Sequence, residues 1–194
     1  VAHTALLDFA GRKACLVLAE DVAAKLPVPP FTNSAMDGFA VRAADTAQEG
    51  RPFCVIGEAP AGSDLDRALE PFEAARIFTG GALPPGADAI VIQENAEVSG
   101  DQVRFSGPAV APGTFVRPAG LDFAQGWTGL KAGTLLDARA IGLAASMGHF
   151  WVAVQRRPRI GLLATGNELR LPGETPEGSQ IIGSNSLLLA TMVE

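Results

Sequence analysis

The sequence contains no tyrosine, only two cysteines and two histidines, and aromatic residues make up just 6% of it. Modules that bind single-stranded nucleic acid stack bases on aromatic side chains, so this scarcity disfavours such a module. Cys15 and Cys54 form no Cys-x-x-Cys motif, and neither histidine lies in a metal-binding pattern, which argues against a zinc site. Reduced thiols are favoured over a disulfide, which stays open as the alternative.

Long apolar runs are also absent, and no segment approaches the roughly 18 residues that a membrane span requires. The first residues, VAHTALLDFAG, lack the charged and apolar regions of a signal peptide. We therefore expect a cytoplasmic protein without a membrane partner. Val1 stands where a chain start would have Met, which indicates a processed or fragmentary start.

What the sequence does contain is enough apolar material for a core: 47% of its 194 residues are hydrophobic. Fifteen Lys and Arg against 21 Asp and Glu give a net charge of −6, which disfavours a general nucleic-acid partner. The length suits one or two domains. Glycine and proline are abundant, with 22 and 14 residues, and they are scattered in turn-like pairs. This distribution predicts many short strands joined by turns.

The sequence predicts a mostly β module at residues 31–118, preceded by segments of different character. Residues 4–10 are expected to be the end of a helix stopped by Gly11, whereas residues 15–24 could be strand or helix. Three prolines within residues 27–30 favour an extended hinge. From residue 31 to 118 we expect a small antiparallel β domain with strands at 39–41, 53–56, 75–78 and 88–92 and a hairpin turn at 99–102.

The C-terminal part changes in character. Asp137 is expected to cap a helix that Gly148 ends, and residues 150–158 and 159–166 are expected to be strands. Ser184 or Asn185 could cap a final helix. Strand, loop and helix are the opening of an α/β unit, and without a second strand the sequence looks cut off there.

Three loops carry candidate functional residues. The first is PPFTNSAMDGFAV, in which a rigid Pro-Pro entry leads to Ser34 and Asp37. Asp37 is either part of an Asp-Gly turn or a carboxylate that holds a hard cation or a water. The second is FTGGALPPGADAIVIQE, where Thr79, Gly80 and Gly81 form either an anion nest or a plain turn. It is not a Walker loop, because no Gly-Lys-Ser/Thr follows.

The third loop, LLATGNE, would deliver Thr165, Gly166, Asn167 and Glu168 to the carboxyl end of a strand, where α/β sheets bind ligands. Here a functional and a purely structural interpretation weigh about equally. A weaker candidate is RPAGLD, which sets Arg117 near Asp122.

Taken together, the strings PPFTNSAMDGFAVRAAD, RIFTGGALPPGADAIVIQE, RPAGLD and LLATGNELRLPG, in this order, resemble the molybdopterin molybdenumtransferase family, which includes MoeA and the E domain of gephyrin. The resemblance starts near residue 17 and covers only the N-terminal half of the family. It implies a mixed α+β multidomain fold. Its parts would be an elongated dimerisation domain (1–24 and 127–157), an inserted β-rich domain (25–126) and the first strand and helix of an α/β molybdopterin-binding domain (158–194).

The resemblance also implies an enzyme that transfers molybdenum from molybdate to adenylylated molybdopterin and releases AMP with the help of Mg²⁺. It implies a homodimer, with molybdopterin adenylyltransferase as the upstream partner, and a site shared between two subunits. The matching residues would be catalytic at Asp37, Thr79 and Glu168, ligand-binding at Ser34, Gly80, Thr165, Gly166 and Asn167, and metal-binding at Asp122 and Glu168.

Two departures from the family pattern affect the expected site, because Asn167 stands where many members have Asp and Leu121 where many have Glu. A chain ending at Glu194 would lack most of the pterin pocket, so on its own it is expected to be inactive. The alternative is a non-catalytic, gephyrin-like scaffold on the same fold. The set of Asp37, Thr79 and Glu168 favours the enzyme, because a scaffold needs no such set.

Overall fold

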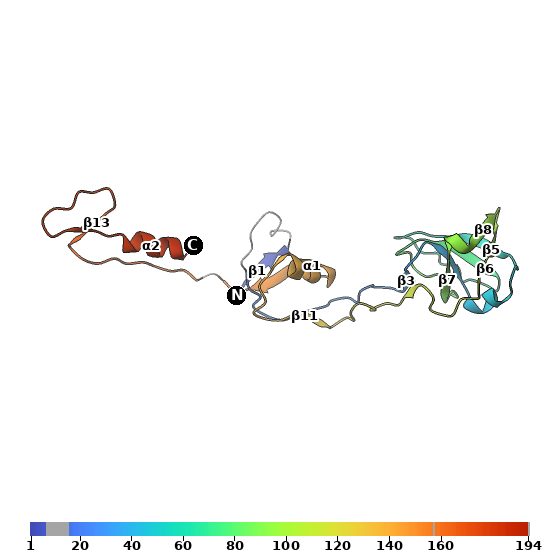
Figure 1. Ribbon diagram of the computed structural model, residues 1–194. Coiled ribbons are helices and arrows are strands. Elements are labelled where there is room, and N and C mark those ends of the chain that lie inside the picture. The colour runs from blue at the N-terminus through green and yellow to red at the C-terminus, as the bar shows by residue number, and fades with distance from the viewer. Residues whose placement is uncertain (7–15, 157, 194) are drawn as a thin grey trace. The chain divides into compact units, whose positions relative to one another are not determined.

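The structure is a computed structural model that describes residues 1–6, 16–156 and 158–193 (Figure 1). Contacts divide the chain into two units, residues 1–155 and 156–194, and each is described by itself below. Most regular structure is β, and the two α-helices among the described residues are short. No described helix is long and apolar enough to cross a membrane.

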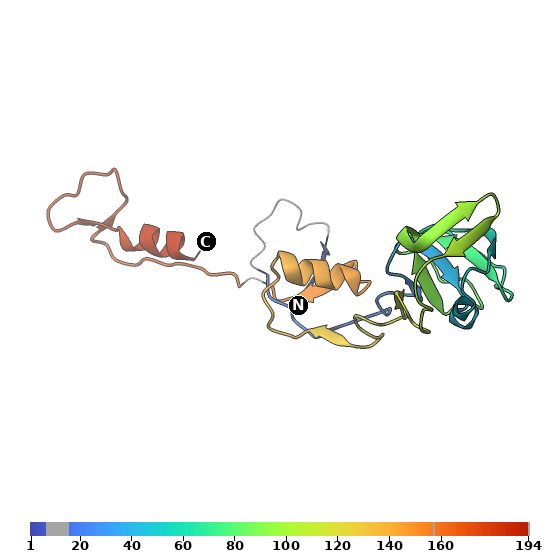
Figure 2. The same cartoon turned by 45° about the vertical axis from the view of Figure 1, so that its right-hand side comes forward.

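A six-stranded sheet is the largest element of the first unit. Its strands lie in the order β7-β4-β6-β5-β9-β8, and β8 and β9 form the predicted hairpin (Figure 2). The strands are β4 (Gly38–Val41), β5 (Phe53–Ala59), β6 (Glu73–Ile77), β7 (Ala89–Ile92), β8 (Ala96–Ser99) and β9 (Gln102–Phe105). Two 3-10 turns, Ala43–Ala47 and Gln93–Asn95, join some of them. The four strands expected in this region are therefore confirmed.

The expectation of a purely antiparallel sheet is wrong at one pair, because β5 and β6 run parallel. Parallel neighbours need a crossover of about a dozen residues or more, and residues 60–72 supply it without a regular helix. In the sequence, residues 60–72 are rich in turn-forming residues and resemble an ordinary connection between antiparallel strands. The other four pairings of the sheet are antiparallel.

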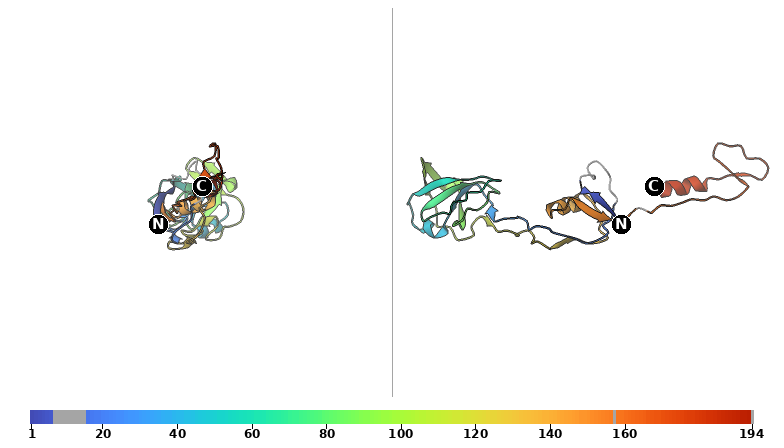
Figure 3. Two further views of the ribbon diagram at one scale, coloured as in Figure 1. Left: turned by 90° about the vertical axis from the view of Figure 1, so that its left-hand side faces the viewer. Right: turned by 180° about the vertical axis from the view of Figure 1, so that it is seen from behind.

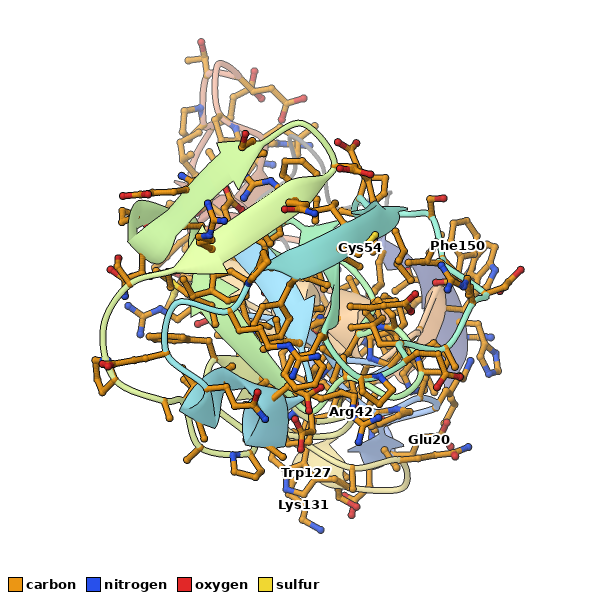
Figure 4. The ribbon with its side chains drawn as sticks, turned by 90° about the vertical axis from the view of Figure 1, so that its right-hand side faces the viewer. Glu20, Arg42, Cys54, Trp127, Lys131 and Phe150 are labelled. Carbon is orange, nitrogen blue, oxygen red and sulfur yellow. The ribbon has the colours of Figure 1, made fainter. Side chains whose placement is uncertain are left out.

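Both faces of this sheet are covered, because successive side chains on a strand point to opposite sides. On β4, Phe39 and Val41 enter one core and Ala40 enters the other. Phe53 is 2% exposed and packs its ring against Phe72 and Phe105 in the first core. Cys54, the next residue along β5, is a free thiol exposed at the surface (Figure 4).

A third core joins the two ends of the first unit. The antiparallel pairs are β1 (Ala2–Ala5) with β12 (Trp151–Val154) and β2 (Val22–Ala23) with β11 (Thr128–Leu130). Leu18, Leu136, Met147 and Val154 are buried together there. Residues 17–23 make β-bridges and a short strand, so their open assignment is resolved as extended.

The expected helix at residues 4–10 is not found where the structure describes it, because Thr4 and Ala5 pair with β12. The remainder of that segment, and Gly11 and Cys15 with it, lies outside the described residues. Strand pairing between residues 146 and 148 positions apart is invisible to a local sequence pattern. The apolar run TALL fits a buried strand as well as a helix.

Helix α1 (Ala138–Ser146) confirms the capping prediction. The carboxylate of Asp137 accepts a 2.8 Å hydrogen bond from the N–H of Ala140, as an N-cap side chain does. Gly148 follows the helix with φ 84°, a conformation that favours glycine. Ala140 and Ala144 of this helix are buried in the third core, and Figure 3 shows the helix beside the strand β1.

The second unit contains the parallel two-residue strands β13 (Leu169–Arg170) and β14 (Ile181–Ile182) and the helix α2 (Asn185–Met192). The final helix is confirmed, and Ser184 occupies its N-cap position without a side-chain hydrogen bond to the helix. The expected strand at 159–166 is wrong, since the structure has no strand there. The described residues offer it no neighbouring strand, and Leu163 is 89% exposed.

The core of the six-stranded sheet yields a direct prediction from two valines that face each other in one hairpin. Val103 is fully buried and Val98 is 61% exposed. Val103→Ala should lower the free energy of unfolding by about 2 kcal/mol, because it removes buried carbon and leaves a cavity. Val98→Ala should change it by less than about 0.5 kcal/mol. Urea unfolding of both variants measures the difference, and equal losses would contradict this core.

Candidate functional site

The short strand β3 (Asn33–Ser34) assembles the loops that carry the predicted site residues. It pairs antiparallel with β10 (Val116–Arg117), which leads into the Arg117–Asp122 loop. Ser34 also donates its N–H to the carbonyl oxygen of Gly81 at 3.0 Å and accepts from the N–H of Gly80 at 2.9 Å. Three of the four motif strings therefore meet at this two-residue strand.

Asp37 and Thr79 form the most specific contact of the site. Asp37 lies just before β4 and Thr79 just after the neighbouring strand β6, so the pairing of these strands brings them together. One carboxylate oxygen of Asp37, Oδ1, accepts the backbone N–H of Thr79 at 2.7 Å and its hydroxyl at 2.9 Å. Asp37 is half-buried and Thr79 is exposed, so the pair is accessible from solvent.

These contacts lower the pKa of Asp37 below its ordinary value. The backbone N–H of Thr79 contributes most and its hydroxyl follows; burial opposes them, and the positive charge of Arg76 adds a smaller lowering effect. Asp37 is therefore ionised at neutral pH. Because its folded pKa is the lower one, ionised Asp37 stabilises the fold above the ordinary pKa of an aspartate, and this contribution is lost as the pH falls through the lowered value.

The TGG loop is a turn whose amides already have acceptors, and not a nest of free donors. The N–H groups of Thr79, Gly80 and Gly81 donate to Asp37, Ser34 and Phe78 respectively. Gly80 has φ 84°, which favours glycine, and a Cβ at Gly81 would collide with the carbonyl oxygens of Ala59 and Phe78. The glycines thus permit the turn. The N–H of Gly80 could bind an anion only if its hydrogen bond to the carbonyl oxygen of Ser34 broke.

The hydroxyl of Ser34 is similarly engaged. It donates to the carbonyl oxygen of Met36 at 2.5 Å and accepts from the N–H of the same residue at 3.2 Å, and Ser34 is 1% exposed. This side chain shapes the turn that presents Asp37. Its predicted role as a ligand-binding residue stays a prediction.

The Arg117–Asp122 pair lies in the loop that begins at β10, the strand paired with β3. One guanidinium nitrogen of Arg117 contacts both carboxylate oxygens of Asp122 at 2.9 Å. Both side chains are partly exposed, so the pair adds little stability. Asp122 and Leu121 themselves face solvent. The carboxylate of Asp122, the predicted metal ligand, is thus paired with the Arg117 side chain of the same chain.

The second unit holds the remaining predicted residues, Thr165, Gly166, Asn167 and Glu168, all of them exposed. Gly166 has φ 145°, and a Cβ there would collide with the carboxylate of Glu168, which folds over it. The backbone carbonyl of Glu168 accepts a 2.7 Å hydrogen bond from Ile181. The structure thus keeps these four residues in one loop.

Among the described residues, no group of three or more histidine, cysteine, aspartate or glutamate side chains lies close enough to hold a metal ion. Asp37 is engaged by Thr79 and Asp122 by Arg117. The described residues therefore do not form a magnesium site by themselves.

Sequence reasoning missed two residues beside the pair, Arg76 and Gln93. Arg76 precedes the FTGG loop on β6, and Gln93 follows β7 and donates its N–H to the carbonyl oxygen of Asp37 at 3.1 Å. Both also line an open groove of about 450 Å³, together with Phe39, Val55, Glu58 and Val98. For Arg76 the available signal was a charged residue within the apolar run of the expected strand 75–78, directly before the candidate loop.

The chain shares its fold with proteins of molybdopterin biosynthesis. The chain superposes with a TM-score of 0.84 on the molybdopterin biosynthesis MoeA protein from Pyrococcus horikoshii, at 31% sequence identity over 99% of this chain and 49% of that one. A second structure of the MoeA protein from Pyrococcus horikoshii OT3 gives a TM-score of 0.80 at 32% identity.

The family model described as "MoeA N-terminal region (domain I and II)" matches residues 3–148, and the chain belongs to this family. The resemblance drawn from the motif strings is thereby confirmed. Curated relatives include molybdopterin molybdenumtransferase 2 of Mycobacterium tuberculosis, 41% identical over 182 residues, and the molybdopterin molybdenumtransferase of a Nostoc species, 37% identical. The alignments cover 92% of this chain but only 45% and 42% of those proteins, so the chain spans less than half their length.

The hydrogen bonds of Asp37 predict the effect of a matched pair of variants. Thr79→Val removes the hydroxyl but keeps the backbone N–H, so the pKa of Asp37 should rise part of the way to its ordinary value. Thr79→Ser keeps both donors and should leave the pKa low. NMR titration of the Asp37 carboxyl carbon measures both. A pKa that is the same in Val and Ser variants would show that the hydroxyl does not bind Asp37.

Proposed function

We propose that this chain acts in molybdenum cofactor biosynthesis as the N-terminal part of a molybdopterin molybdenumtransferase. In that reaction molybdenum passes from molybdate to adenylylated molybdopterin, and AMP is released. The observation that carries the proposal is the Asp37–Thr79 pair, a carboxylate and a hydroxyl from two separate motif strings joined by two hydrogen bonds. The names of the relatives support the reaction class.

The geometry suggests what each group contributes. Thr79 engages only Oδ1 of Asp37, which leaves Oδ2 to accept a hydrogen bond from a protonated oxygen nucleophile. A carboxylate with a lowered pKa is a weak base, so we assign Asp37 the role of orienting that nucleophile and not of strongly activating it. The hydroxyl of Thr79 retains lone pairs for a second contact.

The proposal also covers residues other than Asp37 and Thr79, a metal ion and a partner enzyme. We propose that Glu168, with Thr165, Gly166 and Asn167, completes the site in a homodimer, and that Asp122 and Glu168 would bind Mg²⁺ once Asp122 is released from Arg117. We also propose that the chain works in the cytoplasm on the product of a molybdopterin adenylyltransferase. The division into a dimerisation domain, a β-rich domain and a pterin-binding domain is part of the same proposal.

A genetic test separates this function from a scaffold. The gene that encodes the chain, in its natural length, should restore molybdoenzyme activity to a bacterium that lacks its molybdenumtransferase. Asp37→Asn should abolish the restoration, because it removes the charge that orients the nucleophile. Asp101→Asn makes the same chemical change at the exposed β8–β9 turn and should leave it intact. Full restoration of molybdoenzyme activity by the Asp37→Asn gene would contradict the assignment of Asp37 to the site. A wild-type gene that restores no activity would favour the non-catalytic scaffold.

The 194-residue chain alone should not complete the reaction. No described residue of 156–193 is buried, so little packing holds the Thr165–Glu168 loop in a fixed position. We therefore expect no AMP release when residues 1–194 are supplied with adenylylated molybdopterin, molybdate and Mg²⁺, and liquid chromatography of the nucleotide product measures it. Catalytic release of AMP by this chain would contradict the expectation.

A further inference from the structure

Arg76 is the residue around which the supports of the Asp37–Thr79 pair converge. Its guanidinium donates to the carbonyl oxygen of Gly38 at 3.2 Å and to the side-chain oxygen of Gln93 at 2.6 Å. It also lies over two aromatic rings, 5.2 Å from the centre of Phe39 and 4.9 Å from that of Phe78. These are hydrogen-bonding and cation–π distances, and the contacts come from β4 and from the segments that directly follow β6 and β7.

Each contact of Arg76 lies next to the pair in the chain or in space. Gly38 follows Asp37, and Phe78 precedes Thr79. Gln93 donates its backbone N–H to the carbonyl oxygen of Asp37 at 3.1 Å. One side chain therefore binds the segment that carries the carboxylate, the segment that carries the hydroxyl, and the segment that holds the carboxylate's own backbone.

The planar guanidinium matters to this arrangement. It offers several N–H donors in a fixed plane, so one group can donate to Gly38 and to Gln93 while it lies within cation–π distance of two rings. An ammonium carries the same charge but lacks the planar fork of donors that serves both acceptors. An ordinary surface cation would lie in solvent, as the exposed Arg104 on β9 of the same sheet does. Arg76 is instead half-buried among its contacts.

We propose that Arg76 is the positioning residue of the Asp37–Thr79 pair: by tying Gly38, Phe78 and Gln93 together it sets the distance between the carboxylate and the hydroxyl. Arg76 touches neither substrate nor the reacting atoms in this role. Its effect on turnover rests on the proposed function, whereas its effect on the geometry of the pair does not.

The test measures the pair directly in the 194-residue chain. Amide hydrogen exchange by NMR follows two N–H groups: that of Thr79, which donates to Asp37, and that of Ile90 on the edge strand β7, which donates to Thr114 at 3.0 Å. Ile90 is fully buried, so its exchange reports a loss of stability of the sheet away from the pair. The variants are Arg76→Lys and Arg76→Gln, with Arg104→Lys as the matched control.

We expect the exchange of Thr79 to accelerate about tenfold relative to Ile90 in both Arg76 variants, and to be unchanged in Arg104→Lys. Equal acceleration at both amides would mean a general loss of stability and would overturn the proposal. Unchanged exchange at Thr79 would overturn it as well. Retention in Arg76→Lys with loss in Arg76→Gln would show that charge alone suffices, which contradicts the role given to the planar group.

The natural-length enzyme supplies a second readout. There Arg76→Lys should lower kcat by about tenfold to a hundredfold and leave the KM for adenylylated molybdopterin nearly unchanged, because a misplaced pair impairs the reaction more than binding. A rise in KM with an unchanged kcat would overturn the positioning role. If the wild-type protein itself shows no turnover, the proposed function fails, and the exchange experiment still decides the role of Arg76.

Discussion

The backbone of β3 is the constraint on which the arrangement of the site depends. A buried N–H or C=O must find a partner, and Ser34 finds both of its partners in the TGG loop while β3 pairs with β10. Two residues therefore fix the position of two loops that lie about 45 and 83 positions away in the chain. Because the side chain of Ser34 is used within its own turn, the same residue also sets where Asp37 emerges.

The chemistry of the site depends on which hydrogen-bonding groups the fold leaves unengaged. The glycines of the TGG loop close a turn and their amides are engaged, so the groups with remaining capacity are side chains. Asp37 is held ionised by Thr79, whose two hydrogen bonds use only its Oδ1, at the ends of the inner strands β4 and β6. A weak base held in this way can act through orientation, which is why we propose a positioning role for the arginine beside the pair.

Much of this could be predicted from the sequence, and the exceptions have physical reasons. The Asp137 cap and the strands near Phe39, Phe53 and Ile90 were predicted because local patterns encode them. The parallel β5–β6 pair and the β1 strand depend on pairing between distant segments, and the expected strand at 159–166 found no described neighbour. Asp37 and Thr79 were identified by resemblance, but the acceptor of Gly80 and the role of Arg76 required the register of the sheet. The predicted domain boundaries remain a prediction.

The most direct test of the account is whether the natural-length protein couples molybdate to the release of AMP. Purified enzyme would be given adenylylated molybdopterin and Mg²⁺ with increasing molybdate, and AMP and pterin-bound molybdenum would both be quantified. The account predicts AMP release that rises with molybdate and one molybdenum bound for each AMP released. Release that ignores molybdate, or molybdenum transfer without AMP, would contradict it.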